Sequence, residues 1–390
     1  MSLRDKIVEE IRAGGPIPFS RYMEMCLYDP EYGYYSRNVE QFGKAGDFYT
    51  SSDVHAVFGR LLARQFEEMW HTLGSPAQIE ILELGPGRGL FARDVLDWSE
   101  KKFPEFFRAV HYSLSERSAA LRERLAATLE THFAAGKVSL GKGATSIVPE
   151  DPPLARALAS GNPLIVFANE FFDALPVDIL SSKGELRITE REGRFGETWS
   201  PPSADDLEYL DRYSVHPEDG ERVETAHIAR SCMSQLAASV QRGFLIAIDY
   251  GYTRAEQLAG RHRGTVTAYR QHSVSANPYE APGEQDITAH VNFTALAAAA
   301  ERQGMQLYPL LTQSQFLMGI GEPNQFADAF EDCRLPQERA KVALQLKHLV
   351  TPAGLGESFH VLVTSKGVAP ELVASLSGLA FGSTKPRDKK

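Results

Sequence analysis

The chain has 390 residues, of which 43% are hydrophobic and 24% charged, a composition typical of a globular protein that buries a substantial core. Its formal net charge is -10 and Lys and Arg form no run before the last few residues, which argues against binding to a nucleic-acid backbone. The three cysteines are far apart and form no CxxC pair, which argues against a disulfide framework and a zinc knuckle.

Residues 1–75 are predicted to form an N-terminal helical cap with a lid loop. Apolar residues within 3–11 share one helical stripe, and those within 54–70 share a second, for which Asp53 would be the N-cap. Five of the fourteen tyrosines lie within residues 22–35, between these helices. They fit the packing of a lid onto the body and the wall of a substrate site equally well.

From Gln78 onward, short apolar runs alternate with amphipathic segments. The runs IEILEL, AVHYSL, LIVFAN and FLIAIDY are the predicted strands of a parallel sheet that helices cover on both faces. Ligands of such sheets bind beyond the carboxyl ends of the strands. The other predicted elements are a β meander over 178–199 with turns at Lys183-Gly184 and Glu192-Gly193, helices over 221–241, 292–304 and about 323–349, and strands over 305–313 and 358–366.

The segment ILELGPGRGLF, residues 81–91, places a glycine-rich elbow directly after the first of these strands. It lacks the Lys-Ser or Lys-Thr of a phosphate-binding P-loop. Gly85, Gly87 and Gly89 give GxGxG, whereas a dinucleotide site requires GxGxxG, and its third glycine would fall on Leu90. The glycines still allow a ligand to approach the backbone closely, because no Cβ atom is in the way.

Two acids beside the elbow indicate which ligand it holds. Glu83, at the end of the strand, would repel a pyrophosphate but attract a cation. S-adenosylmethionine (SAM) carries an ammonium group, a sulfonium and a ribose, and no phosphate. Glu116 ends the next strand region, 27 residues after Gly89, where a carboxylate can hold a ribose diol. An isolated Glu116 would equally fit a solvated helix start, but the pair with the elbow favours a SAM site.

ANEFFDALPV, residues 168–177, follows another predicted strand and places Asn169, Glu170 and Asp173 at the same edge of the sheet. These acids would also suit the N-terminus of a helix. Methyl transfer from a sulfonium requires alignment of the acceptor and exclusion of water. If the acceptor is a guanidinium, paired carboxylates can orient it and receive its proton, which makes these three residues the catalytic candidates.

No competing chemistry is apparent in the sequence. It contains no HExxH, HxH or GxSxG motif, so neither a metal site nor a nucleophile elbow is predicted. Asp47 and Asp249 are further acids at predicted loop or strand ends, each with an alternative as a turn or cap residue.

Taken together, these motifs closely resemble the MidA-like family of SAM-dependent methyltransferases. The resemblance runs in order from about residue 7 to residue 366. The family includes the mitochondrial protein arginine methyltransferase that assists assembly of respiratory complex I. The segments that carry it are PIPFSRYMEMCLYDPEYGYYS, GDFYTSSDVHAVFG, ELGPGRG, NEFFDALPV, IDYGY and YRQHSVSANPYEAPGEQDITAHVNFTAL.

This resemblance implies the α/β fold of a class I SAM-dependent methyltransferase. The fold is Rossmann-like, with a seven-stranded, mostly parallel sheet whose last strand is antiparallel, and with helical additions. The methyltransferase domain would span residues 76–366, with insertions at about 178–241 and 314–350, before a partly disordered tail at 367–390. The residues expected to bind SAM are Glu83, Gly85, Gly87, Gly89 and Glu116, together with Asp47, Thr50 and Ser51 of a segment, Gly46 to Ser52, that closes over the cofactor.

The leading hypothesis is a SAM-dependent methyltransferase that modifies an exposed arginine of a protein, such as a subunit of a respiratory or other multisubunit complex. The alternatives are a small-molecule O- or N-methyltransferase and an assembly chaperone that binds SAM without transferring a methyl group. The start at Met1 has the charge pattern of neither a signal nor a transit peptide, and no segment has eighteen uninterrupted apolar residues. A cytoplasmic protein of bacterial type without membrane insertion is therefore expected, and a homodimer is compatible with the sequence.

Two departures from the family pattern are noted. The strand before Glu116 is Tyr-Ser-Leu-Ser, more polar than the usual aliphatic run, and Asn292 stands where an Asp is common. Neither change removes a predicted cofactor contact.

Overall fold

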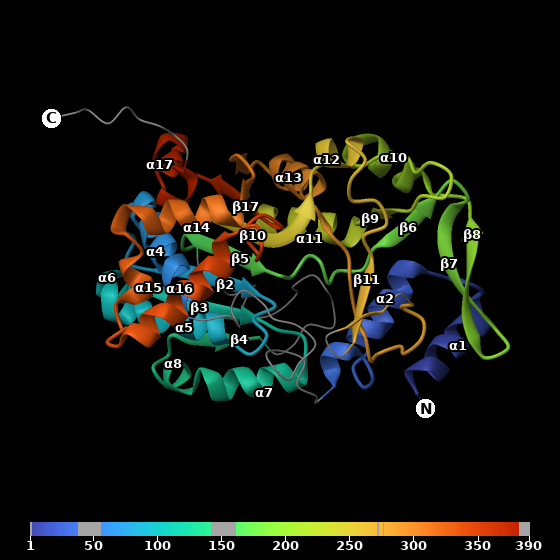
Figure 1. Cartoon of the computed structure of the whole chain (residues 1–390), viewed down its shortest axis with the longest axis horizontal. Helices are drawn as coiled ribbons and strands as arrows, with labels where there is room; N and C mark the ends of the chain where they lie inside the picture. The colour runs from blue at the N-terminus through green and yellow to red at the C-terminus, as the bar shows by residue number, and fades with distance from the viewer. Residues whose placement is uncertain (1, 38–55, 142–160, 271–272, 276, 382–390) are drawn as a thin grey trace.

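The computed structural model describes residues 2–37, 56–141, 161–270, 273–275 and 277–381. The molecule is elongated, with a large sheet and its helices at one end and a smaller antiparallel sheet at the other (Figure 1). The predicted contacts of Asp47, Thr50 and Ser51, the N-cap role of Asp53 and residues 382–390 of the tail that is predicted to be partly disordered all fall outside the described residues.

The main sheet has the strand order β15-β17-β10-β5-β2-β3-β4, and β14 and β16 add short pairings to β10 and β17. Its central strands are parallel, and β17 runs antiparallel to β10. This arrangement confirms the predicted fold class. The strands are β2 (Ile79–Leu84), β3 (Val110–Ser115), β4 (Val138–Leu140), β5 (Leu164–Asn169), β10 (Gly243–Tyr252), β14 (Val291–Asn292), β15 (Gln306–Leu307), β16 (Leu311–Thr312) and β17 (Phe359–Lys366).

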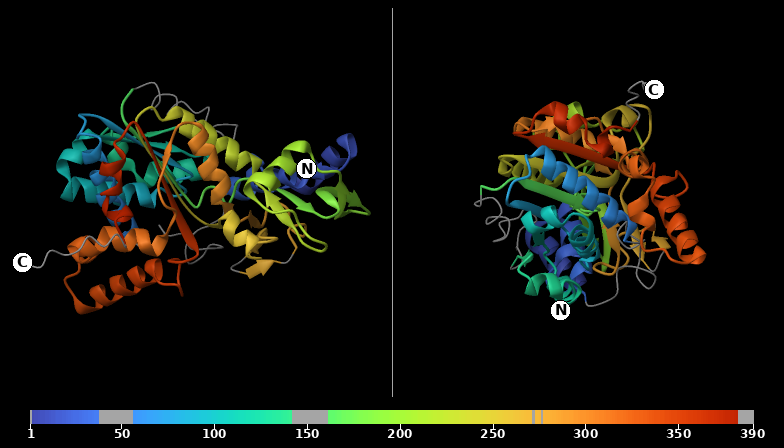
Figure 2. Two further views of the ribbon diagram at one scale, coloured as in Figure 1. Left: turned by 90° about the horizontal axis from the view of Figure 1, so that it is seen from above. Right: turned by 90° about the vertical axis from the view of Figure 1, so that its left-hand side faces the viewer.

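Helices cover the main sheet on both faces (Figure 2), because its strands are apolar on both sides. In β5, Ile165 and Phe167 pack into one hydrophobic cluster, and Leu164 and Val166 pack into the other. The first cluster includes residues of α4 (Val57–Thr72), α5 (Leu90–Lys102), α6 (Pro104–Ala109), α14 (Gln313–Gly321), α15 (Ala327–Phe330) and α16 (Pro336–Val350). The second includes residues of α11 (His227–Ser239) and α13 (Phe293–Arg302).

The smaller sheet is antiparallel and packs against the first two helices. Its strands follow the order β1-β7-β6-β9, with β8 paired to β7. A third hydrophobic cluster joins α1 and α2 to β7 and to β13 of a three-stranded sheet. The elements are α1 (Leu3–Gly14), β1 (Ile17–Pro18), α2 (Phe19–Tyr28), the 3-10 turn η1 (Tyr34–Ser36), β6 (Asp178–Ser181), β7 (Gly184–Arg191), β8 (Arg194–Ser200), α10 (Ala204–Tyr213), β9 (Val223–Thr225), β11 (Thr267–Arg270), β12 (Ser273–Ser275) and β13 (Asp286–Thr288).

The remaining short elements lie at the edges of the fold. They are α7 (Ala119–Thr128), α8 (Glu130–Ala134), α12 (Arg254–Leu258), η2 (Glu322–Asn324), α17 (Pro370–Ala374) and η3 (Ser377–Leu379). Within the ranges that the structure describes, no helix is both long and apolar enough to cross a membrane.

The structure confirms the meander and corrects three other elements. The predicted helix over 221–241 begins with strand β9 and becomes helical only at His227. The predicted strand over 305–313 forms two short pairings, β15 and β16, on either side of Pro309, which has no N–H for a ladder hydrogen bond. The predicted helical stretch over about 323–349 is divided into η2, α15 and α16, and helix α14, which precedes it, was not predicted.

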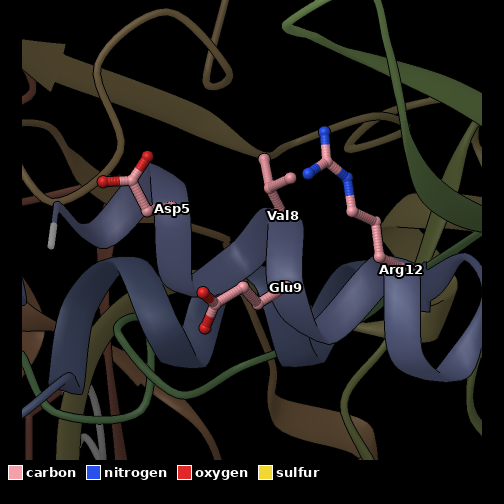
Figure 3. Close-up of a pocket in the computed structure, with 4 residues that line it drawn as sticks. All are labelled: Asp5, Val8, Glu9 and Arg12. Carbon is pink, nitrogen blue, oxygen red and sulfur yellow. The ribbon is translucent and has the colours of Figure 1, made fainter.

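The predicted apolar stripe of α1 is correct except at one position. Leu3, Ile7 and Ile11 are buried, but Val8 is partly exposed. Val8 lies with Asp5, Glu9 and Arg12 in a hollow on the surface of α1 (Figure 3). All of these side chains belong to one helix, and none is among the predicted site residues.

The register of the main sheet brings the predicted site segments to one edge. Leu84 at the end of β2 pairs with Ser115 of β3 and with Ala168 of β5. Asn169 at the end of β5 pairs with Ile248 of β10. Since neighbouring parallel strands end at the same level, the residues that follow them meet at the carboxyl edge.

Candidate active site

The glycine elbow joins β2 to α5 through three residues in the left-handed region. Gly85, Gly87 and Gly89 have φ of 60°, 53° and 76°, values that other residues adopt only with strain. A Cβ at Gly89 would lie 2.6 Å from a methyl carbon of Leu125, and one at Gly85 would lie 3.1 Å from the ring of Phe171. The elbow therefore requires glycine for its backbone conformation and for close packing.

Glu83 points from β2 toward the β3 side of this elbow and is 4% exposed. The hydroxyl of Tyr112 donates a hydrogen bond to its carboxyl group at 2.9 Å. Burial raises the pKa of Glu83 to about 8. Without a ligand, Glu83 is therefore largely protonated at neutral pH, and a bound cation would favour its ionised form. Whether the Glu83 carboxyl group is negatively charged thus depends on whether a cationic ligand is bound.

Glu116 follows β3 directly and faces the elbow. Its carboxylate accepts the N–H of Ser118 at 2.8 Å. Burial raises its pKa to about 7, whereas backbone N–H groups, among them that of Gly87, act in the opposite direction. The charge of Glu116 also contributes to the raised pKa of Glu83. The two predicted acids therefore lie close together at the elbow.

These residues fit SAM. The three glycines of the elbow have no side chain to obstruct a ligand, and the two acids beside it resist ionisation because they are buried. An ammonium or sulfonium group would relieve this cost, and a carboxylate at the end of β3 suits a ribose diol. Contact of Glu83, Gly85, Gly87, Gly89 and Glu116 with the cofactor stays a prediction.

The loop after β5 is shaped by Asp249 of β10. The N–H groups of Phe171, Phe172 and Asp173 donate to Asp249 Oδ2 at 3.2, 3.0 and 3.3 Å, and the N–H of Tyr250 donates to Oδ1 at 3.0 Å. Convergence of three successive N–H groups requires a sharp turn, and the residue before them, Glu170, has a φ of 50°. Asp249 is therefore the anchor of the loop.

Two of the catalytic candidates, Glu170 and Asp173, lie in this loop, and the third, Asn169, is the last residue of β5. Asp173 is 7% exposed, and the hydroxyl of Tyr250 donates to its Oδ2 at 2.6 Å. Its Oδ1 is buried and has no hydrogen-bond partner in the described parts of the chain. Asn169 donates to Glu170 at 3.0 Å, and its own oxygen is buried without a described partner. The end of β5 and the loop after it thus offer two buried acceptor oxygens to a donor.

Burial raises the pKa of Asp173 to about 6. The hydroxyl of Tyr250 and the N–H groups of Asp173 and Ala174 act in the opposite direction, and the net rise makes this carboxylate a stronger base than an ordinary Asp. Of the three candidates, Asp173 therefore combines burial, an available oxygen and a suitable pKa. Its role in catalysis stays a prediction.

The tyrosine partners of this loop are not among the residues predicted from the sequence. Tyr250 lies in the motif IDYGY, and its hydroxyl donates to Asp173. Tyr28 donates to the carbonyl of Ala174 at 2.9 Å. Ser118 caps α7 by accepting the N–H of Leu121. The cluster of tyrosines in residues 22–35 was the available signal, because it could have been a substrate wall.

Substitution of Asp249 by Ala is expected to lower the free energy of unfolding by about 3–5 kcal/mol, because several buried N–H groups lose their acceptor at about 1–3 kcal/mol each. The melting temperature should fall by about 10 °C. Thermal denaturation followed by circular dichroism would measure both. Binding of S-adenosylhomocysteine (SAH) should also weaken, because the loop carries Phe171 against Gly85.

Asp206→Ala is the matched control for this loss. Asp206 is also buried, and accepts hydrogen bonds from Ser203, Thr225 and His227 in the smaller sheet region. Its removal should destabilise the protein without changing SAH binding below the melting transition. If both variants bind SAH equally well, Asp249 does not serve the site.

Affinity for SAM is expected to rise between about pH 6 and pH 8. Glu83, with a pKa of about 8, must lose its proton to face a cation, and Glu116, with a pKa of about 7, must lose its proton to accept hydrogen bonds from both ribose hydroxyls. Below its pKa, each group contributes up to about tenfold in affinity per pH unit. Isothermal titration calorimetry in buffers of different ionisation enthalpy would measure both the Kd and the protons released.

Tyr112→Phe gives this pH dependence a specific test. The Tyr112 hydroxyl lowers the pKa of Glu83, so its removal should move the rise in affinity to higher pH. A Kd that is constant over this range, with no proton release, would contradict the assignment of both acids to the cofactor.

Comparison with known proteins agrees with this geometry. A family model described as that of an S-adenosyl-L-methionine-dependent methyltransferase matches residues 61–310. The mitochondrial protein arginine methyltransferase NDUFAF7 homolog of Drosophila melanogaster is 28% identical over 401 residues, covering 94% of this chain and 85% of the relative. The mitochondrial protein arginine methyltransferase NDUFAF7 of Mus musculus is 29% identical, with 91% and 82% covered.

Solved structures give the same result. A COG1565 superfamily member from Burkholderia thailandensis, crystallised with SAH bound, has a TM-score of 0.81 at 27% identity, covering 97% of this chain and 94% of that one. A native structure of a COG1565 superfamily protein from the same organism has a TM-score of 0.78 at 28% identity. This chain therefore belongs to the MidA-like family of SAM-dependent methyltransferases, and its methyl donor is SAM.

Proposed function

We propose that this enzyme is a protein arginine N-methyltransferase. The observation that carries the proposal is the buried Asp173 carboxylate, which has one oxygen held by Tyr250 and the other without a partner in the described ranges. It lies in the loop whose Phe171 ring contacts Gly85 of the elbow. The names of the curated relatives, which specify protein arginine methyltransferases, support the same acceptor class.

The chemistry requires little of the protein beyond positioning and removal of a proton. Bound SAM supplies an electrophilic methyl group on a cationic sulfur. Asp173 would accept a hydrogen bond from an N–H of the guanidinium and thereby orient the nitrogen that is methylated. The proton that this nitrogen loses would pass to Asp173, whose pKa of about 6 suits a general base near neutral pH.

Quantitative mass spectrometry of methylated peptides tests this function. Cells with and without the gene would be compared, and the expected result is a mono- or dimethylarginine that is lost from one protein. Loss of a methylated small molecule instead would indicate a metabolite methyltransferase. An unchanged methylation pattern, with a defect in a multisubunit complex, would indicate a SAM-binding assembly chaperone.

The acceptor protein is proposed to be a subunit of a respiratory or other multisubunit complex, as the motif resemblance implies. A cytoplasmic location is also proposed, and the curated relatives are named as mitochondrial proteins. Identification of the methylated peptide would name the acceptor, and fractionation of cells expressing a tagged chain would give the location.

A further inference from the structure

Two buried carboxylates from distant parts of the chain each bind a tyrosine hydroxyl. Asp173 follows β5, and Asp286, 2% exposed, begins β13. Tyr250 donates to Asp173 Oδ2 at 2.6 Å, and Tyr35 donates to Asp286 Oδ1 at 3.0 Å. Together with Tyr28, these residues are called the Tyr–Asp cluster: Tyr28, Tyr35, Asp173, Tyr250 and Asp286.

Hydrogen bonds to the backbone and one aromatic contact connect the members of this cluster. The N–H of Ala289, just after β13, donates to the carbonyl of Asp173 at 3.0 Å. On the other side, Tyr28 donates to the carbonyl of Ala174, and the rings of Tyr28 and Tyr35 are 5.6 Å apart between centroids. The segments that carry the two carboxylates are thus connected by the hydrogen bond between Ala289 and Asp173 and by the contact between Tyr28 and Tyr35.

The charges of both carboxylates raise the pKa of the same tyrosine, Tyr35. Burial raises the pKa of the Tyr35 hydroxyl, and the charges of Asp286 and Asp173 raise it further. Two negative charges near two aromatic rings favour a cation, and the guanidinium of Arg117 already lies over one face of the Tyr28 ring, 5.0 Å from its centroid. Oδ1 of Asp173 has no hydrogen-bond partner among the described residues, and a donor placed there would offset the cost of a buried acceptor without a donor, about 1–3 kcal/mol.

We infer that the Tyr–Asp cluster binds the guanidinium of the acceptor arginine, and that Asp286 is a specificity-determining residue of the site. Asp173 and Asp286 would accept N–H groups on two edges of the guanidinium, and the rings of Tyr28 and Tyr35 would face its plane. This inference rests on the proposed function for the choice of arginine as the acceptor.

The cluster suits a guanidinium better than an ammonium. A guanidinium is planar, carries five N–H donors and stacks on aromatic rings, so it can use two carboxylates and two rings at once. A lysine ammonium is a compact charge that is more strongly hydrated. Removal of one carboxylate should therefore weaken arginine binding more than lysine binding.

The cluster is also connected to the cofactor elbow on two sides. The hydroxyl of Ser118 donates to the carbonyl of Tyr35 at 2.5 Å, and the N–H of Ser118 donates to Glu116. In the loop that carries Asp173, Phe171 contacts Gly85. A guanidinium held by the cluster would therefore lie beside the cofactor site.

Binding of small probes tests the inference without knowledge of the acceptor protein. Nα-acetyl-arginine amide and Nα-acetyl-lysine amide would be titrated by NMR into the SAH-saturated full-length protein at neutral pH. The arginine probe should bind at least about tenfold more tightly than the lysine probe. Asp286→Asn should weaken arginine binding by at least about tenfold and change the Kd for SAH less than about twofold. Asp205→Asn, an exposed acid of α10, is the control and should change neither.

A measurement on the unmodified protein covers the case in which Asp286→Asn does not fold. With selectively labelled tyrosines, nuclear Overhauser effects are expected between the arginine probe and the rings of Tyr28 and Tyr35. Equal affinity for both probes, an unchanged affinity in folded Asp286→Asn, or the absence of these effects at saturation would overturn the inference.

The outcomes for the inference and for the proposed function are separable. Arginine binding by the cluster without any loss of cellular methylarginine would leave the inference intact and contradict the proposed function. Loss of cellular methylarginine, combined with unchanged probe binding in Asp286→Asn, would support the function and contradict the role of Asp286.

Discussion

Asp173→Asn is expected to lower the rate of methyl transfer by about 10²–10⁴-fold, the usual contribution of a general base. The amide keeps the size of the side chain and can still accept the Tyr250 hydroxyl, but it cannot take up a proton. Transfer of labelled methyl groups from SAM to proteins of a strain that lacks the enzyme would measure the effect. Calorimetry should show a Kd for SAH within about twofold of that of the unmodified protein.

Two comparisons make this result specific. The exposed Asp205→Asn control should retain full transfer activity, since Asp205 lies on α10 and is exposed. Asp173→Ala should be at least as inactive as Asp173→Asn and less stable, because the Tyr250 hydroxyl would lose its acceptor. Full activity of folded Asp173→Asn would exclude Asp173 as the base.

Gly87→Val is expected to weaken the binding of SAM and SAH by at least about a hundredfold, which corresponds to roughly 3 kcal/mol. Gly87 has a φ of 53°, and its N–H donates to Glu116. A β-branched side chain would strain this conformation by about 1–2 kcal/mol, displace the N–H from Glu116 and occupy the face of the elbow that a ligand approaches. Calorimetry with SAH would measure the loss.

Gly193→Val separates loss of the site from loss of stability. Gly193 lies in the β7–β8 turn with a φ of 76°, and a Cβ there would meet nothing within 4 Å. This variant should carry a similar backbone strain and a similar fall in melting temperature, yet bind SAH normally. If Gly87→Val bound SAH as tightly as Gly193→Val, the elbow would not be the cofactor site.

The local features of the fold could be predicted from the sequence. The runs IEILEL and LIVFAN carry apolar residues on both faces, which is typical of central parallel strands, and they form β2 and β5. Gly184 and Gly193 mark the meander turns and have positive φ. The three residues of β9 were predicted as helix, because so short a strand shows no period and exists only through its pairing with β6.

The composition of the site could also be predicted, but the roles of its acids could not. Asp173 and Asp249 both follow apolar runs and look alike in the sequence. In the structure, backbone N–H groups surround Asp249 and make it an anchor, whereas Asp173 keeps an oxygen without a described partner. Asp286 was not singled out, because nothing near it in the sequence marks it as a partner of Tyr35.

The sequence by itself determined the class of fold, the glycine elbow and the positions of acids at strand ends, because these depend on hydrophobic period and on local backbone conformation. Only the tertiary structure decided which acids are buried, which hydroxyls hold them and which tyrosines of the N-terminal segment reach the loop after β5. Burial and hydrogen bonding depend on contacts between residues far apart in the chain, such as the 251 positions that separate Tyr35 from Asp286.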